Sequence, residues 1–277
     1  MTLPATASEQ SAALLLVRRF WALALRHIYL HMGSWPRIVE MMYWPLVNIF
    51  SWGFTSIYLT RKIAHIEVMG AAIVASVVLL EFFIRTTMTS LTLFMEELWS
   101  RNLGHLFSSP LSPREYAIGI VMTALVRTSI ALIPLLIISN YVFGFSILSL
   151  GWAGAAYVLL LSLNGCAYGL MIVSLILRLG LSAEWLAWMA TWLLIPFLAP
   201  YYAVDVLPRA FQVISYALPP TYVFESMKSQ IADGKVLPEK LLTASVLTVV
   251  YAAAAAFVFW RAYLSARKEG RLLQSGE

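Results

Sequence analysis

The sequence has few charged residues and a single cysteine, and each shortage excludes a class of protein. Only 12% of its 277 residues are charged, whereas soluble proteins average about 25%. Hydrophobic residues make up 61%, which is more apolar surface than a soluble core can bury, although lipid can receive it directly. The lone Cys166 cannot form an internal disulfide framework and is expected to fill space in the packing. The composition therefore indicates a membrane protein.

Three further patterns are missing from the sequence. The apolar runs lack the alternation that strands of a membrane barrel need, so the elements that cross the membrane are expected to be helices. No basic cluster interleaved with aromatic residues stands on a polar segment, so nucleic acid is not an expected partner and the formal net charge of +5 reflects sidedness instead. No G-x-x-x-x-G-K-[ST] phosphate loop occurs, so this chain by itself is expected neither to bind ATP nor to be an enzyme.

The hydropathy pattern predicts an all-α integral membrane protein with one transmembrane domain over residues 1–277. Crossing the hydrocarbon core takes about 20 residues of helix. Residues 10–32 place three arginines opposite an apolar face, which predicts an amino-terminal helix lying at the membrane surface. Six expected spans follow, at residues 38–60, 69–93, 116–140, 152–177, 184–204 and 241–264. The polar segment 94–115 separates spans two and three, and an outer segment 205–240, expected to be helical or re-entrant, separates spans five and six.

Six spans place both termini on the same side of the membrane, and the basic residues indicate which side. Of the 19 Arg and Lys residues, Arg85 and Arg127 lie near the middle of expected spans. With the termini in the cytoplasm, eleven others face inward, namely Arg18, Arg19, Arg26, Arg37, Arg101, Arg114, Arg178, Arg261, Arg267, Lys268 and Arg271. The outward-facing residues are then Arg61, Lys62, Arg209, Lys228, Lys235 and Lys240. This excess favours cytoplasmic termini and makes segment 94–115 the first cytoplasmic loop.

The segment 94–115 needs a surface to lie on. Its charged residues and its prolines, Pro110 and Pro113, place it in water, while Leu98, Leu103 and Phe107 are apolar enough to dock. A short amphipathic helix docked on a second protein and a solvated turn without a partner both fit this pattern. The apolar stripe and the length favour docking.

Two short motifs carry a resemblance to a known family. The first motif is Glu97, Arg101, Gly104, Leu106, Pro110, Leu111 and Ser112, followed by Gly119. The second is Leu218-Pro219-Pro220-Thr221-Tyr222 with Glu225. Together with the order of the predicted parts, they resemble the permease subunit of ABC-2 type exporters. His105 and Pro220 stand where that family more often has Thr and Leu, which leaves the subfamily and the substrate open.

The resemblance implies a transport function. It makes segment 94–115 a coupling helix in the cleft of a separate ATPase subunit, and the expected coupling residues are Glu96, Glu97, Arg101, Asn102, Gly104, His105 and Pro110. ATP and Mg would be bound by that partner, with no cofactor or metal in this chain. The other implied partners, in a bacterial inner membrane, are lipid and a second permease copy, in a homodimer or a pseudo-symmetric heterodimer. Lipids, hydrophobic drugs and lipid-linked glycans are all compatible substrates, moved outward where spans one, two and five meet.

An enzyme is the sharpest alternative. Glu96-Glu97-x-x-x-Arg101 fits the start of the intramembrane metalloproteases of the prenyl-protein protease type. Those enzymes need further histidines at F-x-x-x-H and H-x-x-x-N spacing, and neither spacing occurs around any of the four histidines. His27 and His31 share a helical face without a nearby carboxylate, so an interfacial pair is favoured over a zinc site. A membrane scaffold that transports nothing is a second alternative.

Three charged residues lie near the middle of expected spans, where an unpaired charge costs about 2.5 to 3.5 kcal/mol on insertion scales. Glu81 and Arg85 share a face of span two, and Arg127 in span three is expected at a similar depth. Glu81 and Arg127 are therefore predicted to pair. The group either lines a substrate path, where the surplus arginine meets an anionic headgroup, or is a buried structural ion network.

Aromatic residues crowd spans one and five. Most are expected in the belts that Trp and Tyr form near span ends. Trp52 and Trp192 lie deeper, where helix packing or a pathway lining would explain them, and Trp188 shares the face of Trp192. Pro196 and Pro200 are expected to break span five near its outer end, which would suit a flexible outer gate.

Overall fold

The computed structural model describes residues 35–62, 67–100, 102, 112–180 and 183–269. Within these ranges the chain forms helices and no strands. The predicted surface helix at residues 10–32 lies outside the described residues. The predicted all-α fold class is confirmed for the part of the chain that can be described.

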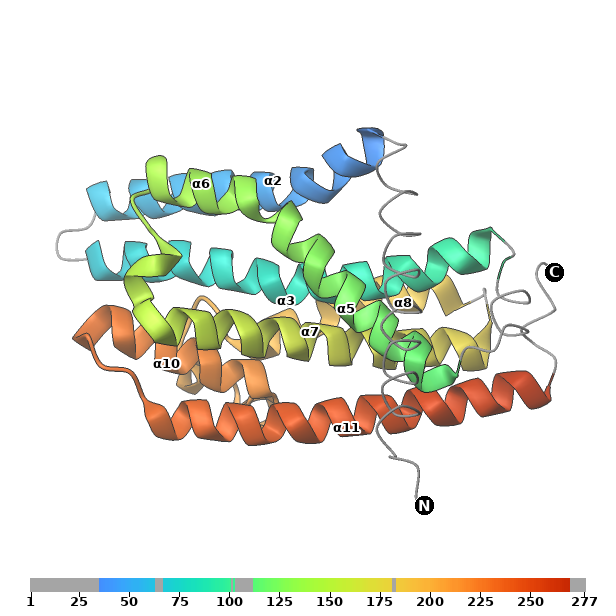
Figure 1. Cartoon of the computed structure of the whole chain (residues 1–277). Coiled ribbons are helices and arrows are strands. Elements are labelled where there is room, and N and C mark those ends of the chain that lie inside the picture. The colour runs from blue at the N-terminus through green and yellow to red at the C-terminus, as the bar shows by residue number, and fades with distance from the viewer. Residues whose placement is uncertain (1–34, 63–66, 101, 103–111, 181–182, 270–277) are drawn as a thin grey trace, which may run out of the picture.

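The helices follow one another with short connections (Figure 1). They are α2 (Trp35–Lys62), α3 (Glu67–Trp99), α5 (Pro113–Ala131), α6 (Ile133–Tyr141), α7 (Gly151–Leu179), α8 (Glu184–Leu193), α9 (Arg209–Ala217), α10 (Pro219–Asp233) and α11 (Pro238–Lys268). Between them, the described ranges include the short 3₁₀ turns η1 (Ile147–Leu150), η3 (Ile195–Leu198) and η4 (Val204–Val206).

Within the described residues, four stretches are long and apolar enough to cross a membrane, so the protein is a multi-pass membrane protein. They are Val68–Trp99, Pro113–Tyr141, Ile147–Leu179 and Pro238–Lys268. The helix α2 covers the predicted first span in position and length but is not among these four. The predicted fifth span is a shorter apolar stretch, Glu184–Leu198. The count of six spans therefore stays a prediction.

Several predicted boundaries were wrong, and each has a local cause. The helix α3 continues to Trp99, so residues 94–99, predicted as the start of the loop, extend span two. The next helix begins at Pro113, where the Ser112 hydroxyl accepts from the Glu115 backbone and the Glu115 carboxylate accepts from the Ser112 backbone, a capping box. Span three divides at Leu132, because Pro134 removes a backbone donor and its ring disturbs the preceding turn.

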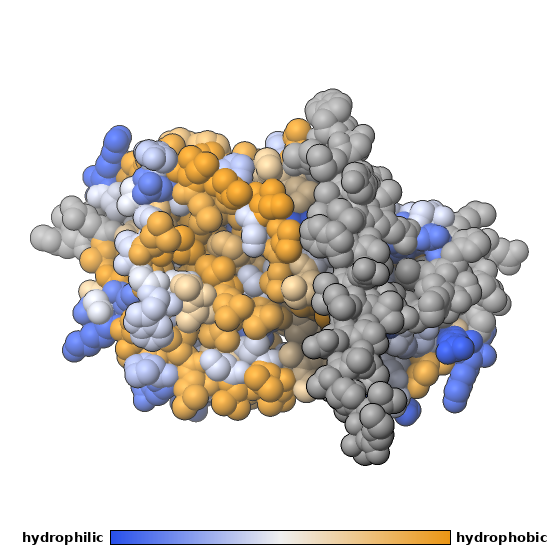
Figure 2. Space-filling model, viewed as in Figure 1, coloured by the Kyte–Doolittle hydropathy of each residue, from blue (hydrophilic) through white to orange (hydrophobic). Residues whose placement is uncertain are grey.

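The long helices lie along one axis of the molecule. Figure 1 shows α3, α7 and α11 side by side, with α2 and α6 on the far side of α3 from α7. The end at which α3 finishes and α5 begins is called here the loop end, and the end at which α3 begins is called the outer end. On the face drawn in Figure 2, apolar side chains gather over the middle and hydrophilic ones toward both ends, as a bilayer requires.

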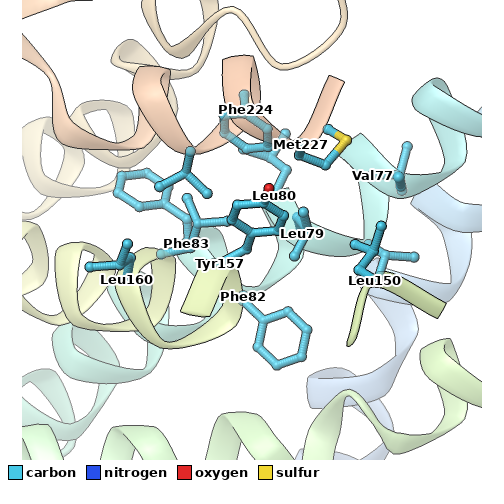
Figure 3. Packing of buried hydrophobic residues seen from close by; sticks show 14 of the residues in the cluster. Val77, Leu79, Leu80, Phe82, Phe83, Leu150, Tyr157, Leu160, Phe224 and Met227 are labelled. Atoms are coloured by element: carbon cyan, nitrogen blue, oxygen red, sulfur yellow. The ribbon is translucent and has the colours of Figure 1, made fainter. Parts of the chain in front are cut away.

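The outer segment is helical, and its second helix, α10, packs into the bundle. Figure 3 shows Phe224 and Met227 of α10 against Leu80 of α3 and Tyr157 of α7, and all four side chains are buried. The Tyr157 and Ser226 hydroxyls are hydrogen-bonded at 3.0 Å, which satisfies both groups inside this apolar core. The prolines Pro219 and Pro220 stand in the first turn of α10, where a missing backbone donor costs little.

Two glycines set how closely α7 approaches α3. A Cβ added at Gly165 would lie 2.0 Å from Thr86 Oγ1 and 2.4 Å from the Phe83 carbonyl oxygen, and one at Gly169 would lie 2.7 Å from Ser90 Cβ. In return, the Thr87 hydroxyl donates to the Gly165 carbonyl at 3.1 Å. Small residues that let helix backbones approach are a main source of association between helices in lipid.

We expect Gly165→Ala to lower the free energy of unfolding by about 1 to 3 kcal/mol, because the added methyl group overpacks against a backbone carbonyl that cannot rotate away. Unfolding of the purified chain in neutral detergent measures the effect. Leu159→Ala, on the exposed face of the same helix, is the control and should change stability much less. Equal effects of the two substitutions would contradict the role assigned to Gly165.

Candidate functional site

A cavity of about 870 Å³ lies between α2, α3, α5 and α8. It brings together residues that the sequence analysis placed in three separate groups. Its lining includes the coupling candidates Glu96, Glu97 and Asn102, the charged residues Arg85 and Arg127, and the tryptophans Trp188 and Trp192. One space therefore joins the start of the predicted coupling segment to the middle of the helices, and it is called here the large cavity.

The loop end of the large cavity is charged. Arg127 Nη1 lies 3.8 Å from Glu96 Oε2, so α5 is tied to the last turns of α3. The Asn102 side-chain amide donates to Glu97 Oε2 at 2.7 Å, and its backbone N–H donates to the Glu97 carbonyl at 3.0 Å. Glu97 is buried, so this contact fixes the chain where α3 ends and the coupling segment begins.

The deep part of the cavity holds a second polar group. Arg85 Nε donates to Glu81 Oε2 at 3.3 Å, and the Asn48 amide of α2 donates to Glu81 Oε1 at 2.6 Å. The predicted pairing of Glu81 with Arg127 was wrong, because Arg127 lies nearer the loop end and pairs with Glu96. Glu81 finds its cation on its own helix one turn away and its amide on α2, which satisfies the carboxylate within the bundle.

Trp188 and Trp192 come from α8, a helix of ten residues that is hydrogen-bonded to α7. Its Ala190 carbonyl accepts from the Tyr168 hydroxyl of α7 at 2.6 Å. Trp188 Nε1 donates to Glu184 Oε1 at 3.4 Å. Trp188 and Trp192, one helical turn apart, both line the large cavity. The predicted break at Pro196 is confirmed, since α8 ends at Leu193 and η3 follows.

A smaller cavity, of about 250 Å³, lies next to the large one toward the outer end. Ile84 and Trp192 line both, so they stand at the partition between them. Glu81 and Asn48 line the small cavity, as does Tyr201. The third aromatic candidate, Trp52, stacks on the Tyr201 ring with centroids 4.5 Å apart and so supports the small cavity without lining it.

The loop that carries Tyr201 is held from two sides. Ser76 of α3 donates its hydroxyl to the Pro200 carbonyl at 2.6 Å. Lys228 of α10 donates to the Ala199 carbonyl at 2.8 Å and to the Tyr202 carbonyl. Ala199 has a φ of 48°, a left-handed conformation that costs a residue with a Cβ and persists only where neighbours hold it. Burial lowers the pKa of Lys228 to about 8.

Some predicted site residues lie outside the described chain. These are the coupling candidates Arg101, Gly104, His105 and Pro110, together with all four histidines of the sequence. Among the residues that the structure does describe, no group of three or more His, Cys, Asp or Glu side chains could hold a metal ion.

Sequence reasoning missed three residues that shape the site. Asn48 was missed because it is uncharged and lies in an apolar run. Its position was nevertheless a signal, because a side-chain amide in an apolar span is expected to form a hydrogen bond to another helix. Tyr201 and Lys228 were missed because their roles depend on the fold of the loop and of α10, which brings residues 26 to 29 positions apart into contact.

Comparison with models of known protein families gives no match to this chain. No curated protein matches it either. The site therefore has to be interpreted from its own residues.

We expect the wild-type chain to gain stability relative to Lys228→Met between pH 8 and pH 10.5. Below pH 8 the lysine is charged in both the folded and the unfolded chain. Between the lowered pKa of about 8 and the ordinary value of 10.5, the lysine is charged only in the unfolded chain, which therefore binds more protons. The free energy of unfolding consequently rises with pH in this range. The full difference is about 3 kcal/mol. Unfolding in neutral detergent across this pH range measures it, and a flat difference would show that the ammonium group is not desolvated.

Proposed function

We propose that this chain is the transmembrane subunit of an ATP-driven exporter of the ABC-2 type. It moves an amphipathic or lipid-like substrate outward, and a separate subunit binds and hydrolyses ATP. In this proposal the chain has six spans with cytoplasmic termini in a bacterial inner membrane, and it works beside a second permease copy. The resemblance carried by the two motifs of the sequence supports the family.

The observation that carries the proposal is the large cavity and its position. A transporter needs a space for substrate that is mechanically connected to the segment on which the ATPase acts. The large cavity meets this requirement, because Glu97 and Asn102 line it and are hydrogen-bonded to each other where α3 ends. A push on the segment after Asn102 would reach the cavity wall through this contact and through the Glu96–Arg127 pair.

The lining also suits an amphipathic molecule. Charged groups gather at the loop end, while Ile84, Met88, Trp188 and Trp192 give the deeper part an apolar and aromatic surface. Sites that bind small molecules commonly combine an apolar lining with a few placed polar groups, and their volumes run from about 300 to 1,000 Å³.

The metalloprotease alternative gains no support from the described contacts. Glu96 lies beside an arginine and Glu97 accepts from an amide, which are stabilising partners for carboxylates rather than a water-activating arrangement. A metal site would also require histidines that the described ranges do not include.

The direct test is extraction in mild detergent followed by isolation of the complex. We expect an ATPase with a phosphate loop to co-purify and its ATP hydrolysis to rise in the presence of this chain. Absence of any ATPase partner would overturn the proposal, and loss of a proteolytic activity on adding a chelator would support the enzyme instead.

Substitutions at the end of α3 test the coupling. We expect Asn102→Ala and Glu97→Gln to reduce the stimulated ATP hydrolysis about fivefold or more, the scale of ordinary coupling between sites, at unchanged folded yield. Arg209→Ala, an exposed arginine in the first turn of α9, is the matched control and should leave hydrolysis unchanged. Unchanged hydrolysis in Asn102→Ala would argue against coupling through this contact.

Glu81→Gln separates the two interpretations of the deep polar group. If the group serves a substrate path, the variant should fold in normal yield and lose hydrolysis that depends on transport. A loss of folded yield with normal specific hydrolysis would instead identify a structural ion network.

A further inference from the structure

The guanidinium of Arg85 is only partly used by the protein. A guanidinium carries five N–H donors. In the described chain the single hydrogen bond of the Arg85 side chain runs from Nε to Glu81. The side chain is 13% exposed, so its remaining donors, on Nη1 and Nη2, lie in a largely enclosed place. These donors have no partner within the described chain and border the large cavity, so a group supplied from outside the chain could accept from them.

The Glu81 carboxylate fixes which way the guanidinium faces. Glu81 is itself held by Asn48 and lines the small cavity, whereas Arg85 lines the large one. The ion pair therefore crosses the partition, with Nε on the Glu81 side. The fork of Nη1 and Nη2 is left for a group in the large cavity, and such a planar fork matches the oxygens of a carboxylate or a phosphate.

Three acids line the large cavity together with Arg85, namely Glu40 of α2 and Glu96 and Glu97 of α3, and the two on α3 are distant from it. Glu96 and Glu97 lie 11 and 12 residues further along α3, about 16 to 18 Å away. Each has a partner of its own, Arg127 and Asn102. Next to Arg85 along the chain are Ile84 and, on the following turn, Met88, both part of the lining. An anion at the Arg85 fork would therefore be far from Glu96 and Glu97, and the nearer carboxylate, Glu81, is held on the Nε side by Arg85 and Asn48.

The large cavity also has an open side through which an apolar chain can pass. Trp44 and Trp192 line it, yet they are 52% and 47% exposed. In the part of the chain that is described, these rings are covered on one side only. In a membrane their outer sides meet lipid or the second copy of the proposed dimer.

We propose that Arg85 binds the anionic headgroup of an amphiphile, a carboxylate or a phosphate group, through Nη1 and Nη2. The tryptophans of α2 and α8 contact the first part of its apolar chain. This inference rests on the proposed function for the idea that the large cavity holds substrate, and it narrows the substrate class to amphiphilic anions. Glu81 acts as the positioning residue, because it holds the guanidinium through Nε and leaves the fork open.

The test measures binding to the purified full-length chain in neutral maltoside detergent by isothermal titration. The probe is dodecyl phosphate, and the comparison ligands are dodecyltrimethylammonium and inorganic phosphate. We expect dodecyl phosphate to bind and the other two not to compete with it. Competition by inorganic phosphate at equal concentration would show that the site binds free anions, and would overturn the proposal that the ligand is an amphiphile. Preferential binding of dodecyltrimethylammonium would overturn the proposal that the ligand is an anion.

Variants assign the binding to Arg85. We expect Arg85→Gln to weaken dodecyl phosphate binding at least tenfold and Arg85→Lys to restore part of it. The double variant Glu81→Gln with Arg85→Gln removes both charges, so it tests the same loss if the single variant folds poorly. Arg178→Gln, in the last turn of α7, is the matched control and should bind normally. Normal binding in a folded Arg85→Gln or double variant would overturn the inference.

This result is independent of the ATPase. Binding that depends on Arg85 in a chain that stimulates no ATPase would leave the site intact and refute the transporter. Stimulated hydrolysis together with normal binding in Arg85→Gln would refute the site alone.

Discussion

The structure depends on one constraint, which is that lipid offers no hydrogen bonds to the polar side chains of α3. These residues must find partners within the protein, and those whose partners lie on neighbouring elements fix where those elements lie. Ser76 holds the loop after η3, Glu81 holds α2 through Asn48, Thr87 contacts the backbone of α7, and Glu96 pairs with α5. The helix α3 is in this way the axis from which the other elements are positioned.

The two sides of α3 differ in how closely other helices approach. On the α7 side, Gly165 and Gly169 let the backbones approach so closely that no further side-chain atom fits between them. On the side of α2 and α8, tryptophans and an arginine hold the helices apart and enclose space. One face of α3 is therefore closely packed, and the other borders the large cavity. A movement of α2 or α8 can change the cavity without disturbing the α3–α7 packing.

The sequence predicted the helices well and their interactions only in part. Long apolar runs made the class and most helix positions recoverable, because a bilayer imposes a strong length requirement. The breaks at prolines were recoverable where they stand near a helix end, as at Pro196, but Pro134 inside an apolar run gave no separate signal. The site residues Arg85, Arg127, Trp188 and Trp192 could be named because charge and large aromatics are rare at such depth. The pairing of the charged residues could not be predicted. Whether Glu81 contacts Arg127 or Asn48 depends on small differences in depth between helices, and hydropathy does not resolve such differences.

The shortness of α8 has a consequence for the lipid around it. The stretch Glu184–Leu198 rises about 22 Å, less than the roughly 30 Å of a hydrocarbon core. Its outer face is apolar, with Trp185, Met189 and Leu193 exposed, so this is a hydrophobic mismatch on the lipid side. A short hydrophobic element is accommodated by local thinning of the bilayer. In the proposed six-span arrangement, the leaflets would be drawn together beside the open flank of the large cavity, and a headgroup entering from the membrane surface would have a shorter distance to travel through hydrocarbon.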